Sequence, residues 1–161
     1  MRINFKRLHP KAVLPRKAHK SDYAFDCVAV TEEEVAPNVW KYGLGFAVQI
    51  NEEDKHLHER YKIAVYARSS IHKTGMILSN GVGIVDEGYT GEVSVIFYHV
   101  MPNLPRYRVG DRVCQIAVED RWANQCPKEL DELKVMDRGA NGYGSTGRKK
   151  QAAFLIAWCG L

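Results

Sequence analysis

A chain of 161 residues that is 45% hydrophobic and 26% charged, with a net charge of +4, fits one globular domain with one core. Its longest wholly apolar run near the end, 152–159, is shorter than the about 20 residues that a helix needs to cross a bilayer, and residues 1–20 lack the apolar centre of a secretory signal. The four cysteines show no paired C-x-x-C spacing, so we expect reduced thiols, a cytoplasmic protein and no membrane partner.

The first twenty residues carry seven basic side chains, and two interpretations compete for them. A nucleic-acid-binding arm is one. The apolar residues among the charges favour the other, a solvated segment that forms a strand. No zinc-finger spacing or aromatic RNA-binding signature accompanies the segment, so we expect no nucleic-acid partner.

Alternation of apolar and polar residues dominates the rest of the chain. It predicts strands over 44–50, 61–65, 93–97 and 112–118, separated by clusters of Gly, Asn, Pro and Asp. Short strands with such turns are typical of an all-β sandwich or barrel. The single helical candidate is 126–136, CPKELDELKVM.

Two clusters in the first half of the chain carry reactive or charged groups. The run 23–30, YAFDCVAV, places Asp26 among apolar residues, where an ionised carboxylate needs a partner or an exposed strand edge. The run 67–72, ARSSIH, offers a guanidinium followed by two hydroxyls, which suit phosphate oxygens. Arg-Ser-Ser is common in loops, so this cluster alone is a weak signal.

A third cluster, 79–97, consists of two extended arms around a glycine-rich bend. Its glycines leave backbone groups accessible, so a hairpin here could bind a flat polar ring through main-chain hydrogen bonds. Asp86, at the turn side, is either a general base that activates water or a carboxylate that bonds its own turn; the cluster alone favours neither.

Two further clusters follow. In the strand 112–118, Gln115 either faces solvent or donates into a site. The run 138–147, RGANGYGSTG, is too rich in glycine for a fixed helix or strand, but its side chains and amides can surround an anion. Phosphate donors in three places without a G-x-x-x-x-G-K-[ST] loop indicate a nucleotide enzyme outside the P-loop class.

In order and together, these five clusters resemble the five motifs of the trimeric deoxyuridine triphosphatases (dUTPases), over about residues 5–147. The resemblance implies an all-β jelly-roll fold and a homotrimer in which each active site draws motifs from all three subunits. We expect a nucleotide-hydrolase domain over 1–137, a flexible closing arm over 138–147 and an extra apolar tail over 148–161.

The resemblance also implies the reaction. The enzyme binds dUTP and hydrolyses it to dUMP and pyrophosphate, which keeps uracil out of DNA and supplies dUMP for thymidylate synthesis. Asp86 positions the water that attacks the α-phosphorus, Asn80 and Gly83 belong to the segment that reads uracil, and Tyr89 lies under the deoxyribose.

The remaining implied roles concern the triphosphate. Magnesium is bound mainly by the triphosphate and meets Asp26 through water. The groups that hold the phosphate chain and stabilise its charge are Arg68, Ser69, Ser70 and Gln115. The arm that closes over the base and the γ-phosphate contributes Arg138, Tyr143, Gly144, Ser145 and Thr146.

Two alternatives stay open at this stage: a dCTP deaminase of the same fold, and a regulatory protein that keeps the dUTPase scaffold and binds a protein partner. The tail 148–161 departs from the family, whose chains commonly stop soon after the fifth motif. We expect it to pack as an extra strand rather than to be a disordered end or a lattice contact.

Overall fold

The computed structural model describes residues 3–50 and 61–120, all within one compact unit, Met1–Gln125. This part of the chain contains ten strands and one short 3₁₀ helix, η2 (Ser69–Lys73). The strand pairs are all antiparallel. The all-β prediction is therefore confirmed, whereas the helical candidate 126–136 lies outside the described residues.

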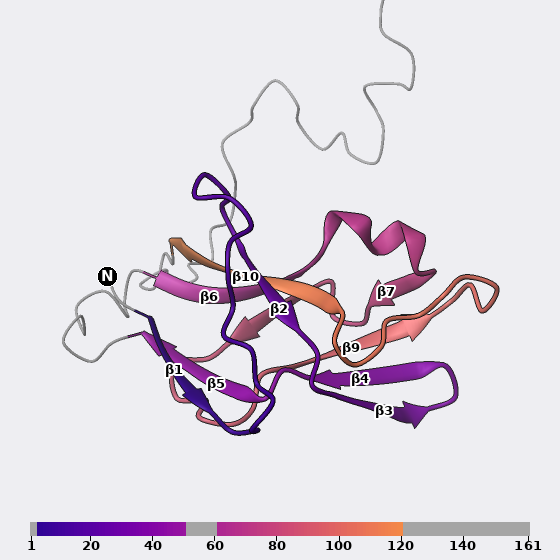
Figure 1. Cartoon of the computed structure of the whole chain (residues 1–161), viewed down its shortest axis with the longest axis horizontal. Helices are drawn as coiled ribbons and strands as arrows, with labels where there is room; N and C mark the ends of the chain where they lie inside the picture. Colours follow the sequence, from indigo (N-terminus) through magenta and orange to yellow (C-terminus); the bar gives the residue numbers. More distant parts are fainter. Residues whose placement is uncertain (1–2, 51–60, 121–161) are drawn as a thin grey trace, which may run out of the picture. The chain divides into compact units, whose positions relative to one another are not determined.

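The ten strands form three sheets, and Figure 1 labels every strand except β8. Sheet A pairs β1 (Ile3–Arg7) with β5 (Phe46–Ile50). Sheet B has the order β2 (Phe25–Val28), β10 (Arg112–Asp120), β6 (Tyr61–Ala67) and β8 (Val82–Val85). Sheet C has the order β3 (Thr31–Ala36), β4 (Val39–Gly43), β9 (Ser94–His99) and β7 (Met76–Leu78).

The basic N-terminal segment forms a strand, as its apolar residues predict. β1 pairs with β5 over five residues, and the rings of Phe5 and Phe46 meet edge to face with 5.5 Å between centroids. The predicted strand 44–50 begins only at Phe46, because Gly45 has a φ of +72° and interrupts the extended backbone.

Sheets B and C contribute to one apolar core. Its largest fully buried side chains are Tyr42, Phe46 and Phe97, and each such burial stabilises the fold by about 1.5–3 kcal/mol. Cys27 and Cys114 face each other across β2 and β10 as buried free thiols, as the expectation of reduced cysteines requires. A hydrogen bond with Cys27, together with burial, raises the pKa of Cys114.

The prediction of a hairpin over 79–97 is wrong in its pairing. Both arms are extended, but β8 pairs with β6 in sheet B, and β9 pairs with β4 and β7 in sheet C. Because both backbone edges of β9 are occupied by its own sheet, β8 joins the other sheet and becomes its edge strand. The two arms therefore diverge, and a pocket lies between them.

Candidate active site

A cavity of about 250 Å³ lies between the two arms of the third cluster. Four residues singled out from the sequence line it together: Asn80, Gly83, Asp86 and Tyr89. Gly83 is needed for close packing here, because a Cβ at this position would lie 3.1 Å from the Cβ of Val65 on the neighbouring strand. Since β8 is the edge strand of sheet B, only one of its backbone edges pairs with β6. The N–H and C=O groups of the opposite edge are available to a ligand.

Asp86 follows β8 directly, and its side chain is exposed. Its backbone carbonyl accepts a hydrogen bond of 3.0 Å from the amide of Tyr89, which closes the turn. Within residues 3–50 and 61–120, no hydrogen bond or ion pair engages the Asp86 carboxylate. The turn-bonding interpretation of this side chain is therefore wrong, and the carboxylate is available to a ligand or a water molecule.

Tyr89 is held at the cavity by two local features. Its hydroxyl donates to the Glu92 carbonyl at 2.8 Å. Its ring lies so close to Gly91 that a Cβ there would sit 2.7 Å from the phenol oxygen. Glu92 is fixed in turn, because its Oε1 accepts a 2.7 Å hydrogen bond from the amide of Gly45. The ring thus lines the cavity from a constrained position.

A second group of predicted residues gathers around Asp26. Asp26 Oδ1 accepts from Arg68 Nε at 3.1 Å and from Gln115 Nε2 at 3.0 Å, and Oδ2 accepts from Arg112 Nη1 at 2.8 Å. The side chain of Asp26 is 11% exposed, so the carboxylate expected to need a partner has three donors. Gln115 stands opposite Asp26 in the β2–β10 register and donates into this group rather than facing solvent.

These contacts orient Arg68 for binding an anion. Its Nη1 donates to Ser70 Oγ at 3.4 Å and to the Arg112 carbonyl at 3.3 Å, while Nε is bound to Asp26. Nη2 has no hydrogen-bond partner in the described part of the chain. Ser69 and Ser70 begin η2 directly after Arg68, so guanidinium and hydroxyls lie on one short segment.

Arg112 also belongs to this group, although sequence reasoning assigned it no role. In a regular strand, Arg112 and Gln115 would point to opposite faces. The β2–β10 register shifts between Arg112 and Cys114, and this irregularity allows both side chains to reach Asp26. Val113 and Cys114 are consecutive, apolar and fully buried, but so nearly are Ile116 and Ala117, where the register does not shift. The apolar pattern alone therefore could not have located the irregularity.

The two groups of residues do not meet within one chain. In the β6–β8 register, Ile63 faces Val85 and Tyr66 faces Val82, so Asp86 and Arg68 follow opposite ends of this strand pair. At about 3.3 Å per residue, the stretch of β6 between them spans about 20 Å. One chain therefore cannot place Asp86 and Arg68 on the same phosphate.

Asp26 has the surroundings of a carboxylate that meets magnesium through water rather than directly. Among the described residues, no three acidic, histidine or cysteine side chains gather to hold a metal ion. Asp26 Oδ2 accepts one hydrogen bond and can accept another, from metal-bound water for example, while the adjacent arginines disfavour direct coordination. The residues present therefore fit the expected contact through water.

The predicted residues of the arm, Arg138, Tyr143, Gly144, Ser145 and Thr146, lie outside the described residues, as do the tail 148–161 and the predicted boundary at 137. Within the described part, no helix is long and apolar enough to cross a membrane.

The fold and the two groups of residues define the class: an all-β protein with a polar pocket at a sheet edge and an arginine–carboxylate group suited to phosphates. The dUTPase family model matches residues 11–147, and the chain belongs to the dUTPase family, whose members hydrolyse dUTP. The prediction of the family and of its jelly-roll-like β fold is confirmed.

Similar proteins agree with this assignment. The deoxyuridine 5'-triphosphate nucleotidohydrolase of Wolinella succinogenes is 33% identical over 150 residues, covering 92% of this chain and 95% of the relative. That of Thermobifida fusca is 32% identical over 152 residues, covering 91% and 79%. Both relatives carry the same enzyme name, and neither is named as a dCTP deaminase.

Two solved structures show the fold. A variant dUTPase of Staphylococcus bacteriophage 80alpha, solved with dUpNHpp, has a TM-score of 0.72 at 20% identity, covering 91% of this chain and 99% of that chain. A variant dUTPase of phage phi11 of S. aureus, whose structure details the coordination of a structural Mg(II) ion, has a TM-score of 0.63 at 18% identity, covering 84% of this chain and 100% of that chain.

Proposed function

We propose that this chain hydrolyses dUTP to dUMP and pyrophosphate, with Asp86 positioning the water that attacks the α-phosphorus. The observation that carries this proposal is the unpartnered Asp86 carboxylate in the same cavity as Asn80, Gly83 and Tyr89. A carboxylate that is exposed and makes no hydrogen bond is free to accept a proton from water.

The cavity suits uracil because an edge strand offers both backbone donors and backbone acceptors. A backbone that donates to O4 and accepts from N3–H presents the wrong pattern to cytosine, whose groups would be left unpaired. Close packing at Gly83 limits the space beside the base, and the ring of Tyr89 limits the space for a 2′-hydroxyl.

The Asp26 group holds the triphosphate. Arg68 offers Nη2, and Ser69, Ser70 and Gln115 offer hydroxyl and amide donors to phosphate oxygens. Asp26 would meet Mg²⁺ through water. When bound to the triphosphate, Mg²⁺ would neutralise part of the negative charge on the phosphates. Arg138, Tyr143, Gly144, Ser145 and Thr146 would close over base and γ-phosphate.

The active enzyme is a homotrimer with shared sites. The separation of Asp86 and Arg68 along β6 and β8 supports the shared sites, since both act on one triphosphate only when different subunits supply them. The number of three subunits is what the resemblance to the trimeric dUTPases implies. The buried free thiols of Cys27 and Cys114 fit a reducing cytoplasm.

The experiment measures pyrophosphate release from dUTP and ammonia release from dCTP by the purified chain, beside the variant Asp86→Asn. We expect pyrophosphate from dUTP, no ammonia from dCTP, and a loss of at least about 100-fold in kcat for the variant. Ammonia from dCTP would identify a deaminase. Native binding of dUTP without turnover would identify a regulatory protein.

A further inference from the structure

Tyr89 forms part of the wall of two cavities. One is the cavity of about 250 Å³ proposed to bind the base. The other, of about 320 Å³, is lined by Tyr89 and Thr90 together with residues of β1 and β5. Tyr89 is 47% exposed, so packing alone does not fix its ring. A ring with space on two sides needs an anchor to stay on one of them.

The anchor of this ring is its hydroxyl, which donates to the Glu92 carbonyl at 2.8 Å. The ring folds back over Gly91 to reach that carbonyl, and a Cβ at Gly91 would sit 2.7 Å from the phenol oxygen. The direction of the Tyr89 ring therefore depends on where the Glu92 carbonyl points.

The peptide bond between Glu92 and Val93 is held by a segment from a distant part of the chain. The Val93 amide donates to the Phe46 carbonyl at 2.9 Å, and the Val93 carbonyl accepts from the Leu44 amide at 3.1 Å. In a trans peptide, the C=O and N–H groups point in opposite directions. The Glu92 carbonyl thus points away from Phe46, and the Tyr89 hydroxyl meets it there.

The Glu92 side chain provides a further tie to the same segment. Its Oε1 accepts from the Gly45 amide at 2.7 Å, and a Cβ at Gly43 would sit 2.6 Å from this oxygen. Gly45 is bound on its other side as well, because its carbonyl accepts from the amides of Leu8 and His9 at 2.8 Å and 3.1 Å. The carboxylate is therefore fastened to a backbone segment that the N-terminal part of the chain holds in place.

We infer that Glu92 is a positioning residue that sets the selectivity for deoxyribose over ribose. Its carboxylate binds the Gly45 amide, fixes the peptide whose carbonyl receives the Tyr89 hydroxyl, and so keeps that ring beside the sugar. This role rests on the proposed function, in which the ring of Tyr89 limits the space for a 2′-hydroxyl.

Loss of the carboxylate would release the ring in two steps. The Gly45 amide would lose its acceptor, and a partly buried amide without a partner is costly enough to make the segment rearrange. The Glu92 carbonyl would then shift, and the Tyr89 ring would turn towards the second cavity. The space left beside the sugar would admit the 2′-hydroxyl of UTP.

The test is a double-mutant cycle in which kcat/KM for pyrophosphate release is measured with dUTP and with UTP. Tyr89→Phe keeps the ring but removes its hydroxyl, and Glu92→Ala removes the carboxylate but keeps the backbone carbonyl. We expect each to lower the ratio of kcat/KM for dUTP to that for UTP about 10-fold, chiefly because UTP turnover rises, and the double variant to lower it no further. Reductions that multiply in the double variant would overturn the inference.

A conservative variant separates the acceptor from its charge. Glu92→Gln keeps a side-chain oxygen that can accept from the Gly45 amide. We expect it to keep the dUTP-to-UTP ratio within about 2-fold of the native value. A reduction as large as that of Glu92→Ala would show that the negative charge acts directly, which would overturn the positioning role.

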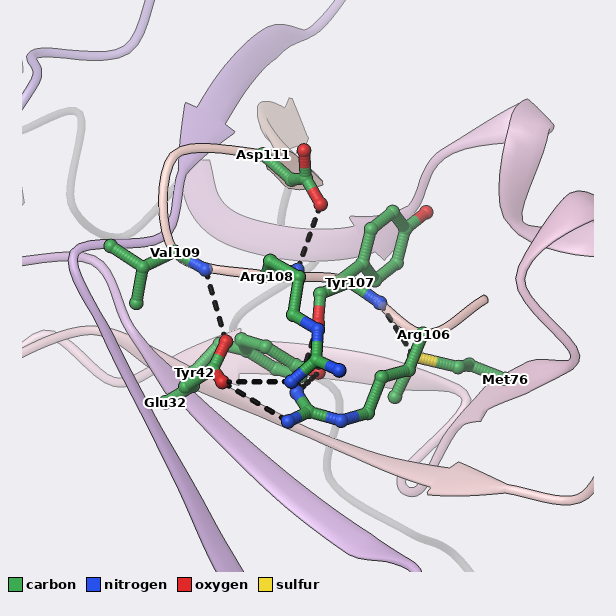
Figure 2. Close-up of polar contacts among 8 residues, drawn as sticks. All are labelled: Glu32, Tyr42, Met76, Arg106, Tyr107, Arg108, Val109 and Asp111. Atoms are coloured by element: carbon green, nitrogen blue, oxygen red, sulfur yellow. Dashed lines mark hydrogen bonds and ion pairs between the residues drawn. The ribbon is translucent and has the colours of Figure 1, made fainter. Parts of the chain in front are cut away.

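Tyr42→Phe is the matched control for Tyr89→Phe. The Tyr42 hydroxyl also donates to a backbone carbonyl at 2.8 Å, that of Tyr107, but Tyr42 lines neither cavity (Figure 2). We expect Tyr42→Phe to lower the thermal midpoint and to leave the dUTP-to-UTP ratio within about 2-fold of the native value. An equal loss of selectivity in this control would show that any loosening of the fold admits UTP.

The remaining outcomes distinguish the inference from the proposed function. A native chain that releases no pyrophosphate from dUTP would overturn the proposed function itself. Native turnover without a preference for dUTP over UTP, or an unchanged ratio in Tyr89→Phe or Glu92→Ala, would overturn the positioning role alone. Failure of Glu92→Ala to fold would show that the carboxylate serves the fold rather than selectivity, and would also overturn that role.

Discussion

Asp26 and Arg68 are bound to each other, with 3.1 Å between the carboxylate Oδ1 and the guanidinium Nε. The carboxylate expected to meet the metal ion and the guanidinium expected to bind the phosphates therefore form one ion pair. They do not act as two independent contacts. Substitution of either residue should disturb the other.

The first prediction concerns Asp26→Asn. This change removes the negative charge that pairs with Arg68 and Arg112, and its NH₂ group faces one of their N–H donors instead of accepting from it. We therefore expect kcat/KM for dUTP to fall about 10–100-fold and the free energy of unfolding to fall by about 1–3 kcal/mol. Steady-state kinetics and urea denaturation measure the two effects. Asp22→Asn is the control, since the exposed Asp22 carboxylate accepts a hydrogen bond from the nearby His19 amide and contacts neither arginine. Equal losses in both variants would contradict a specific role for Asp26.

A second prediction separates the two arginines. Arg68→Gln removes the guanidinium offered to the phosphates, and we expect it to reduce kcat/KM at least about 100-fold. Arg112→Gln removes only one of the three donors to Asp26, so a loss of about 3–10-fold is expected. Arg108→Gln, which alters an arginine that is 64% exposed and paired with Glu32, should leave kcat/KM unchanged. Arg112→Gln as damaging as Arg68→Gln would show that Arg112 itself binds phosphate.

The third prediction tests the shape of the cavity. Gly83→Ala would place a Cβ 3.1 Å from the Cβ of Val65, so Val65 must move by a few tenths of an ångström. We expect KM for dUTP to rise about 10-fold because this crowding alters the surface beside the base. Gly88→Ala is its matched control, because a Cβ there has no atom within 4 Å. Kinetics of the two variants at the same temperature decide the matter. A normal KM in Gly83→Ala would remove Gly83 from the base-binding surface.

The fourth prediction concerns Glu32 and acid stability. Burial tends to raise the pKa of Glu32, but hydrogen bonds from Arg106, the Val109 amide and Arg108 outweigh it, so the pKa lies below the ordinary value of 4.5. A group with a lowered pKa stabilises the fold above its unfolded pKa, and this stability is lost as the pH falls through the folded pKa.

Glu32→Gln should therefore reduce the free energy of unfolding by about 1–3 kcal/mol at pH 7, and the difference from the native chain should shrink below pH 4.5. Urea denaturation between pH 7 and pH 3 measures it. Glu33→Gln, at an exposed position on the same strand, should change stability by less than about 0.5 kcal/mol. A difference that grows on acidification would contradict the assigned charge state.

The fifth prediction concerns shared sites. Light scattering should give three times the chain mass of 18.3 kDa. Asp86→Asn and Arg68→Gln should each be inactive alone, yet their coexpression should restore up to about a quarter of native activity, because some sites receive both native residues from different subunits. Mixed trimers without activity would place both residues of a site in one subunit.

The sequence predicted the positions of the strands better than it predicted which strands pair. Alternation is a local signal, so β5, β6, β9 and β10 were found within a few residues. Pairing depends on which edges other strands occupy, and nothing within 79–97 indicates that β4 and β7 flank β9. The predicted hairpin was wrong for this reason, although its residues do line one pocket.

In the candidate site, too, local groups of residues were predicted and contacts between distant strands were not. Asn80, Gly83, Asp86 and Tyr89 are close in sequence and converge as expected, whereas Arg112 reaches Asp26 only through a register shift that composition does not reveal.

The position of β8 at the rim of sheet B carries a consequence for solubility. Val82 and Ile84 are 42% and 59% exposed on this short strand, a combination that invites another polypeptide to pair alongside. A nucleobase hydrogen-bonded to the open backbone edge of β8 would occupy the place where another polypeptide could pair. Bound substrate should therefore reduce further association between trimers through β8, while the trimer itself persists.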